Sequence, residues 1–381
     1  MLSISSRLPD IGTTIFDVMT KMANENGAIN LSQGFPDFEI DAKLVTLVNE
    51  FMAKGYNQYA TMLGIAPLRQ IIAEVIEKSF GHRVGWETDI TITSGATEGI
   101  FACISAFVSP GDEVILFDPA YDSYDPAIRL NGGIPVQINL TFPDFSIDWD
   151  LVKRKITPRT RMIMINTPHN PTGSVLKAAD LEELERIALK HNLIVLSDEV
   201  YERLMYDGLK HQSVLTRPGL ASQSLAIFSF GKTFHATGWK MGYVVAPEYL
   251  SREVRKTHQF IVYSVNTPIQ YALSEYLKTP EHYTSLGKFY QEKRDYFLSR
   301  MHGSSFEPLQ TRGSYFQIFS YRSISDKTDI EMAEEMTKKH KVACIPVSVF
   351  YKDKTDNRLL RFCFAKKRET LEKATEILRK I

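Results

Sequence analysis

Lys232 is the residue whose surroundings favour chemistry most clearly. It lies in Ser-Phe-Gly-Lys-Thr-Phe-His-Ala-Thr-Gly-Trp-Lys-Met-Gly-Tyr (residues 229–243), a glycine-rich and weakly charged segment that follows the apolar run 225–228. An ammonium group among such neighbours is poorly solvated, which lowers its pKa and frees the amine to act as a nucleophile or base. Lysines of this kind form Schiff bases with carbonyl compounds. The segment alone leaves open the alternative of a solvated surface lysine.

Two other polar residues follow short apolar runs that are typical of strands. Asn170, in the turn sequence Asn-Pro-Thr-Gly, comes after residues 162–165, and Asp198 follows residues 193–196, with Ser197 between them. Ligands of open parallel sheets bind at the carboxyl ends of the strands. We therefore expect Asn170, Asp198 and Lys232 to converge on one cleft.

Arg361 is a charged residue within an apolar sequence, Leu-Leu-Arg-Phe-Cys-Phe-Ala (residues 359–365). Burying a guanidinium alone is costly, so this side chain needs an anionic partner, and its planar fork suits a carboxylate. A structural ion pair is the alternative. Arg358, at the polar start of the run, serves as a comparison for Arg361. Glu199 serves the same purpose for the adjacent Asp198 and is expected to meet solvent or a salt bridge.

Strand and helix patterns alternate through the middle of the chain, which predicts a mostly parallel sheet covered on both faces in a large α/β domain. The predicted strands are residues 90–93, 113–117, 162–165, 194–196, 225–228 and 242–246, and the clearest helices are residues 97–108 and 179–191. After residue 283 the pattern indicates a smaller α+β domain, with helices at 286–301, 330–340 and 369–379 and strands at 314–319 and 358–365.

Composition narrows the class of protein. The chain has 381 residues, with 45 Lys+Arg against 45 Asp+Glu, and therefore has no basic footprint for nucleic acid or an anionic membrane. An apolar content of 44% supports a true core. The three cysteines and the absence of an apolar signal core at the N-terminus favour a reduced, cytoplasmic protein without a membrane span. We predict no metal site.

The order and spacing of these motifs resemble the pyridoxal-phosphate (PLP) aminotransferases of fold type I. The resemblance extends from Gln33-Gly-Phe-Pro-Asp-Phe38 to Arg361, and is strongest with the class I group of kynurenine, glutamine and bacterial methionine aminotransferases. It implies the PLP-dependent transferase fold type I. It also implies a large PLP-binding domain at residues 41–284, a small domain at 285–381, and an N-terminal segment, 1–40, that belongs to the small domain.

The resemblance assigns a role to each polar residue around the cofactor. Lys232 is the lysine that holds PLP covalently and later moves a proton. Asp198 pairs with the pyridine nitrogen and keeps it protonated, which makes the ring an electron sink. Tyr201 and Asn170 bind the phenolic oxygen, and Tyr121 stacks on the ring.

The phosphate of the cofactor is expected where a strand leads into a helix. The sequence Ser-Gly-Ala-Thr-Glu-Gly (residues 94–99) places the free N–H groups of Ala96 and Thr97 at a helix start, which attracts anions. By resemblance, Ser229 and Lys240 add further donors. Tyr59 matches a tyrosine that reaches the phosphate of the neighbouring subunit, which implies a homodimer with shared active sites.

The substrate is expected to be an L-amino acid, with a 2-oxo acid as acceptor. By resemblance, Arg361 binds the α-carboxylate, helped by Gly34 and Asn170. No second arginine for a distal carboxylate is evident. An aromatic wall is predicted instead, and it favours methionine, aromatic amino acids or glutamine; its residues are Phe16, Tyr121, Tyr263 and Phe316.

Two other functions are compatible with parts of this pattern. A PLP-dependent C–S β-lyase acting on sulfur-containing amino acids shares the same carbanion chemistry. An aminotransferase-like sensing domain of a transcription regulator would carry a DNA-binding module before the fold. The segment before Gln33 is short and is not basic, so we favour an enzyme.

Overall fold

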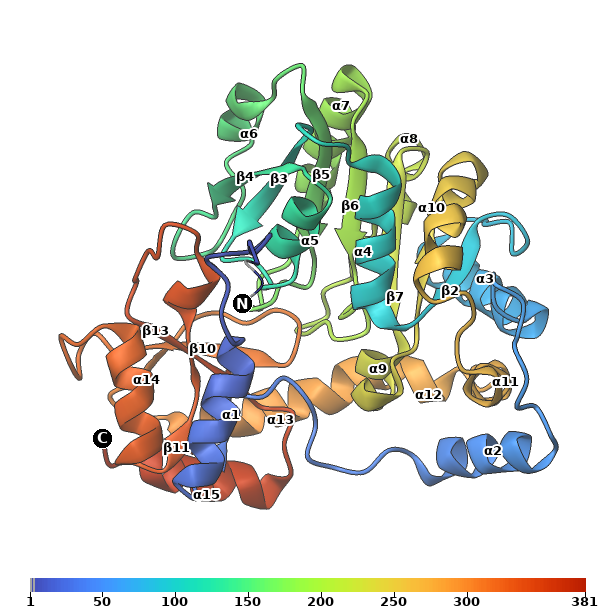
Figure 1. The fold of residues 1–381 in the computed structure, drawn as a ribbon. Helices are drawn as coiled ribbons and strands as arrows, with labels where there is room; N and C mark the ends of the chain where they lie inside the picture. Colours follow the sequence, from blue (N-terminus) through green and yellow to red (C-terminus); the bar gives the residue numbers. More distant parts are fainter. Residues whose placement is uncertain (1, 3) are drawn as a thin grey trace.

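The computed structural model describes Leu2 and residues 4–381. Within these residues, a seven-stranded sheet forms the centre of the molecule (Figure 1). In spatial order its strands are β2 (Ile90–Thr93), β8 (Gly242–Val245), β7 (Ser224–Ser229), β6 (Ile194–Asp198), β5 (Thr160–Asn166), β3 (Glu113–Asp118) and β4 (Ile134–Asn139). β8 runs antiparallel to β2 and β7, and the other neighbouring pairs are parallel. The predicted α/β class is confirmed.

Alternate residues of each strand supply two separate cores, as expected for a sheet that is covered on both faces. In β7, Leu225 and Ile227 pack with α4 (Gly95–Phe107) and α10 (Glu248–Ile261). Ala226 and Phe228 face the opposite core, to which α3 (Ala66–Phe80), α7 (Ala178–His191) and α11 (Thr267–Tyr276) contribute. These strands read as continuous apolar runs because both of their faces are buried.

Strand β4 is absent from the sequence-based prediction. It is an edge strand of the sheet, contains Pro135, and leaves Ile134 44% exposed. An edge position tolerates proline and exposure. β4 therefore lacks the apolar run that identified the other strands.

A second module packs beside the carboxyl ends of the large sheet. Its antiparallel sheet has the order β12 (Ile345–Pro346), β13 (Leu359–Cys363), β10 (Phe316–Ser320) and β9 (Glu307–Pro308). The N-terminal segment joins this module, because β1 (Ile29–Asn30) pairs in parallel with β11 (Val342–Ala343). Figure 1 shows α1 (Ile15–Glu25) beside α14 (Asp329–Lys338). The boundaries at residues 40 and 284 stay a prediction.

The remaining elements connect or cover these layers. They are α2 (Ala42–Ala53), α5 (Tyr124–Leu130), α6 (Trp149–Lys155), α8 (Pro218–Ala221), α9 (Phe230–Thr233), α12 (Glu281–Thr284), α13 (Leu286–Met301) and α15 (Arg368–Leu378), with short 3-10 turns η1 (Val214–Thr216), η2 (Thr237–Trp239) and η3 (Val347–Phe350). Among the residues described, no helix combines the length and apolar character needed to cross a bilayer.

Candidate active site

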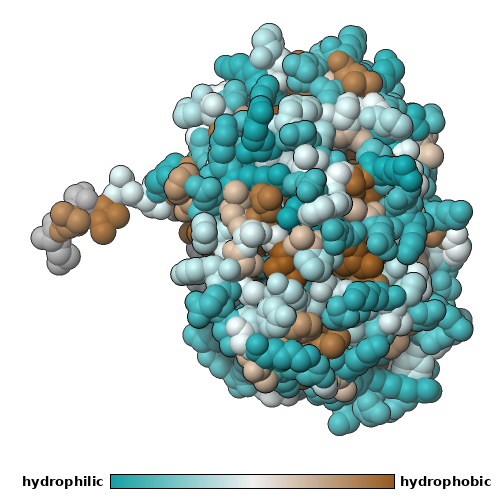
Figure 2. Space-filling view, turned by 90° about the vertical axis from the view of Figure 1, so that its right-hand side faces the viewer, coloured by the Kyte–Doolittle hydropathy of each residue, from teal (hydrophilic) through white to brown (hydrophobic). Residues whose placement is uncertain are grey.

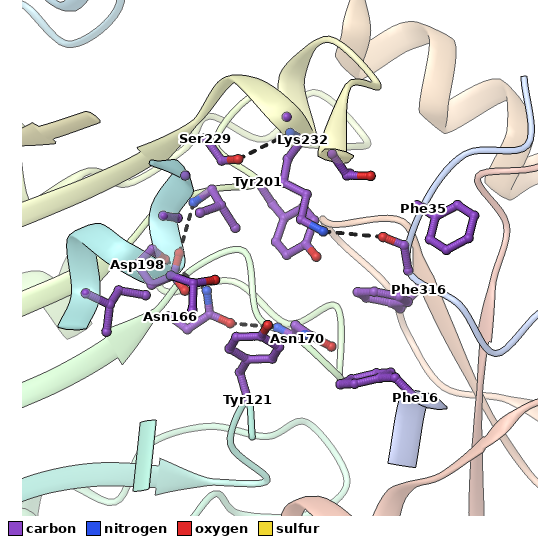
Figure 3. Close-up of a pocket in the computed structure, with 18 of the residues that line it drawn as sticks. Phe16, Phe35, Tyr121, Asn166, Asn170, Asp198, Tyr201, Ser229, Lys232 and Phe316 are labelled. Carbon is purple, nitrogen blue, oxygen red and sulfur yellow. Dashed lines mark hydrogen bonds between the residues drawn. The ribbon is translucent and has the colours of Figure 1, made fainter. Parts of the chain in front are cut away.

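A cavity of about 280 Å³ lies at the carboxyl ends of the large sheet, facing the second module. It gathers most of the residues selected from the sequence, which come from segments far apart in the chain (Figure 3). The predicted site residues that line it are Phe16, Gly34, Ala96, Thr97, Tyr121, Asn170, Asp198, Tyr201, Ser229, Lys232, Lys240 and Arg361.

Lys232 projects into this cavity from the short helix that follows β7. The hydroxyl of Ser229 accepts a hydrogen bond from the Lys232 N–H at 3.3 Å, which fixes the turn. Its Nζ donates to the Tyr315 Oη at 3.1 Å and to the Gly34 carbonyl at 3.3 Å. Burial lowers the pKa of this amine to about 8. Lys232 is therefore not a solvated surface lysine, and its neutral form is accessible near neutral pH.

Asp198 is the last residue of β6 and is buried beside the cavity. The Tyr124 hydroxyl donates to its Oδ2 at 2.5 Å, and the Val200 N–H donates to Oδ1 at 3.3 Å. Burial raises its carboxyl pKa to about 6. A carboxylate held in this way is suited to a cationic N–H partner, which would favour its ionised form.

Glu199 points away from this cavity, as expected for the next residue of a strand end. Its carboxylate is fully buried and contacts the His211 Nε2 at 2.7 Å, the Ser197 hydroxyl at 2.8 Å and the Val214 N–H at 3.1 Å. Of the two expected surroundings, solvent is wrong, and the carboxylate instead meets the His211 imidazole. The carboxylates of Asp198 and Glu199, although adjacent in sequence, therefore contact different parts of the molecule.

Arg361 is fully buried in β13 and has no carboxylate within 4 Å among the residues described. Its Nη1 donates to the Asn170 Oδ1 at 2.7 Å, its Nη2 donates to the Ser32 carbonyl at 2.9 Å, and its Nε has no partner within the described part of the chain. The guanidinium stacks on Phe316, 3.9 Å from the ring centroid. Burial lowers its pKa to about 10. A structural ion pair is therefore not the reason for this arginine, whereas an incoming anion suits it.

The start of α4 forms the opposite end of the cavity. Its first N–H groups have no partners within the helix and point beyond its N-terminus. Gly95 has φ of +73°, and the Lys240 side chain lies close to it. A Cβ on Gly242 would lie 2.9 Å from the Ala96 nitrogen, so glycine is required there for β8 to approach α4. This end suits a phosphate.

Aromatic side chains form the sides of the cavity. Tyr121 and Phe16 lie near each other, with ring centroids 6.5 Å apart, and Figure 3 shows both beside Phe316. Tyr201 is buried, which raises the pKa of its phenol and keeps it protonated as a hydrogen-bond donor. The Asn170–Pro171 peptide bond is cis.

Two predicted residues lie outside this cavity. Tyr59 is 83% exposed and Tyr263 is 48% exposed, and their rings meet edge to face at 5.5 Å on the surface. The expectation that Tyr263 forms a wall of the cavity is wrong for the cavity of its own chain, because the strained turn at Tyr263 (φ +67°) follows α10 on the outer surface. The role of Tyr59 toward a neighbouring subunit stays a prediction.

Sequence reasoning missed three residues that position the site. Tyr124 holds Asp198, Asn166 accepts from the Asn170 N–H at 2.8 Å, and Tyr315 contacts Lys232. Tyr124 lies shortly after Tyr121 in the sequence, and Asn166 lies shortly before Asn170. Closeness in sequence to a predicted site residue was therefore the available signal. Tyr315 gave none, because an aromatic residue in an alternating strand pattern is usually part of a core.

The arrangement of a lysine, a strand-end carboxylate and a helix start around one cavity, on this sheet topology, defines a transferase of fold type I. The chain belongs to the aminotransferase class I and II family, whose sequence pattern matches residues 26–378. It is 46% identical to a methionine aminotransferase of Escherichia coli over 99% of this chain and 98% of that protein. It is 33% identical to kynurenine–oxoglutarate transaminase 3 of Rattus norvegicus over 98% and 89% of the two chains.

Solved structures agree with this assignment. The crystal structure of YbdL from Escherichia coli, described as having a methionine aminotransferase function, superposes with a TM-score of 0.98 at 46% identity over all of both chains. N-succinyldiaminopimelate aminotransferase of Mycobacterium tuberculosis gives 0.95 at 36% identity over 99% and 100% of the chains. The chain is therefore an aminotransferase, and these relatives do not favour a C–S lyase.

Proposed function

We propose that this enzyme uses PLP to transfer the amino group of methionine or an aromatic L-amino acid to a 2-oxo acid. The observation that carries the proposal is Arg361, a buried guanidinium with an unpaired Nε that lines the same cavity as Lys232. The α-carboxylate of an amino acid would supply the anionic partner that this arginine lacks. The aromatic sides of the cavity favour an apolar substrate side chain.

The residues of the cavity fit PLP at each end. Lys232 offers an amine to the aldehyde, Asp198 offers a carboxylate to the pyridine nitrogen, and the start of α4 with Ser229 and Lys240 offers donors to the phosphate. When bound, PLP supplies the electron sink that stabilises a carbanion.

The protein's own contribution is orientation and proton movement. Arg361 binds the substrate carboxylate and fixes the Cα with respect to Lys232. The neutral amine of Lys232 would take the proton from Cα, and the resulting ammonium would donate it to the former aldehyde carbon of the cofactor. Asp198 maintains a positive charge on its ring partner, while Tyr201 donates from a protonated phenol.

An assay of the purified protein with PLP tests this function. We expect L-methionine and a 2-oxo acid to give 4-methylthio-2-oxobutanoate and the corresponding amino acid, with ping-pong kinetics. A panel of methionine, phenylalanine, kynurenine, glutamine and aspartate ranks the donors, and aspartate is expected to be poorest. Pyruvate and a thiol from a cysteine conjugate, formed without an acceptor, would indicate the lyase instead.

Changing Asp198 to Asn is expected to lower kcat for L-methionine about 100-fold, the loss of one strong charge-assisted hydrogen bond of ~3 kcal/mol. The reason is that a neutral amide no longer favours a protonated pyridine nitrogen. Glu199→Gln is the matched control. It is expected to lower thermal stability through its buried contact with His211 while retaining kcat per folded molecule. Equal kcat losses in both variants would contradict the role of Asp198.

The exposed apolar surface around Tyr59 supports a homodimer with shared active sites. Residues 58 and 60 are tied to the segment after α10 by hydrogen bonds from Thr267 and Ser264, and nearby Phe260 is 85% exposed. Figure 2 views the side that carries α2, α3 and α11 in Figure 1, and hydrophobic side chains lie near the middle of that face. Patches of this kind mark interaction sites. Sedimentation of the purified protein should give a dimer, and a monomer would contradict the proposal.

A further inference from the structure

Tyr315 is the buried polar residue nearest to the end of Lys232, and the chemistry described above gives it no role. Its hydroxyl donates to the Gly34 carbonyl at 2.5 Å. With its only proton used there, the oxygen presents lone pairs, and the Lys232 Nζ approaches to 3.1 Å as a donor. Since Nζ also reaches the Gly34 carbonyl at 3.3 Å, the three atoms form one closed set of hydrogen bonds.

The position of this hydroxyl is fixed by its surroundings. Tyr315 is fully buried, and its ring packs edge to face on Tyr201 at 5.1 Å. The residue before it, Ser314, has φ of +63° and is held through its N–H by the Leu204 carbonyl at 3.1 Å. The Tyr206 hydroxyl donates to the Ser314 carbonyl. Tyr315 is thus anchored from three sides and cannot follow the lysine.

Lys232 is proposed both to attach the cofactor and to transfer a proton. Its free amine therefore needs a defined position. Lys232 has four rotatable bonds, and confining such a chain costs conformational entropy. The two oxygens at Tyr315 and Gly34 are the acceptors within reach of its amine in this structure. The Tyr315 hydroxyl belongs to the second module and the Gly34 carbonyl to the N-terminal segment, whereas Lys232 follows a strand of the large sheet.

We infer that Tyr315 and the Gly34 carbonyl form a docking site for the free Lys232 amine, and that Tyr315 is a positioning residue for the proton transfer that this amine performs. The inference rests on the proposed function for its second part only. Docking limits the amine to a small region from which it reaches the substrate Cα, and a loss of this restraint slows the transfer without weakening substrate binding.

The first test needs no turnover. In cofactor-free protein, Lys232 is acylated with acetic anhydride across a pH series, and its modification is quantified by peptide mass mapping. Tyr315→Phe removes an acceptor that stabilises the ammonium, so the midpoint of labelling should move to lower pH by about 0.5 or more. The other charged or titratable groups around Lys232 are unchanged by this substitution; they include Asp198, Tyr201, Lys240, Arg361 and Cys363.

The second test measures the transfer itself. In PLP-loaded enzyme, the single-turnover rate with L-methionine should fall about 10-fold in Tyr315→Phe, with KM within about twofold, because a misplaced group slows the chemical step more than binding. The isotope effect with Cα-deuterated methionine should rise, since proton transfer then limits the rate more fully.

Tyr290→Phe is the matched control, because Tyr290 is equally buried in the same aromatic cluster but bonds His235 at 2.9 Å and not Lys232. It should leave labelling and the isotope effect unchanged. The inference is overturned if Tyr315→Phe and Tyr290→Phe behave identically. It is also overturned if Tyr315→Phe shifts the labelling midpoint without slowing the single-turnover rate, or slows the rate without shifting the midpoint. If wild-type enzyme does not use methionine, the proposed substrate fails, while the labelling comparison still decides whether the docking site exists.

Discussion

Replacing Lys232 with Ala is expected to remove transamination almost completely, with kcat/KM for L-methionine lowered by ~10⁴ or more. Positioned proton transfer alone contributes about 10²–10⁴ in rate, and this variant also loses the amine that attaches the cofactor. The measurement is a coupled assay of 2-oxo acid formation. Borohydride reduction followed by peptide mass mapping should find the cofactor on residue 232 of the wild type and on no residue of the variant.

Lys293→Ala provides a control with a lysine of similar burial. Its Nζ donates to the Lys366 carbonyl at 2.8 Å and lies 4.6 Å from the Phe38 ring centroid, outside the cavity lining. This substitution should retain activity within a few fold. A reduced cofactor found on another lysine, such as Lys240, would contradict the assignment of Lys232 and the mechanism built on it.

The sequence predicted those parts of the site that depend on local order along the chain. Asn170, Asp198 and Lys232 follow β5, β6 and β7, and a parallel sheet brings the ends of such strands to one edge. Arg361 was recognisable because a guanidinium among Leu, Phe and Cys is costly to bury without an anion. In each case a general physical rule connects the residue type to its place.

What escaped prediction depends on contacts between distant segments. Tyr315 meets Lys232 only after the second module has packed against the large sheet, and nothing in its own neighbourhood marks it as polar and functional. Tyr263 was expected in the cavity wall but lies on the surface, outside the cavity of its own chain, and its sequence neighbourhood did not indicate this. Glu199 was separated from Asp198 correctly by strand alternation, yet its partner His211 could not be inferred from spacing.

Changing Arg361 to Lys is expected to lower kcat/KM for L-methionine by roughly 100-fold, because an ammonium lacks the fork that binds a carboxylate through two parallel hydrogen bonds. Most of the loss should be seen as a raised KM, since the carboxylate is bound throughout the reaction. Arg358→Lys is the control: Arg358 precedes the same strand, is solvent-accessible and pairs with Asp326 at 2.7 Å. The kcat/KM of Arg358→Lys for L-methionine should equal that of the wild type.

A substrate without the carboxylate separates recognition from structure. 3-(Methylthio)propylamine keeps the side chain of methionine but offers nothing for Arg361 to bind, so its slow reaction should be similar in wild type and Arg361→Lys. If the variant lost as much activity on this amine as on methionine, Arg361 would act by holding Asn170 and Ser32 in place rather than by binding substrate. The unpaired Nε argues for the first outcome, because a purely structural guanidinium at full burial would have all of its donors satisfied.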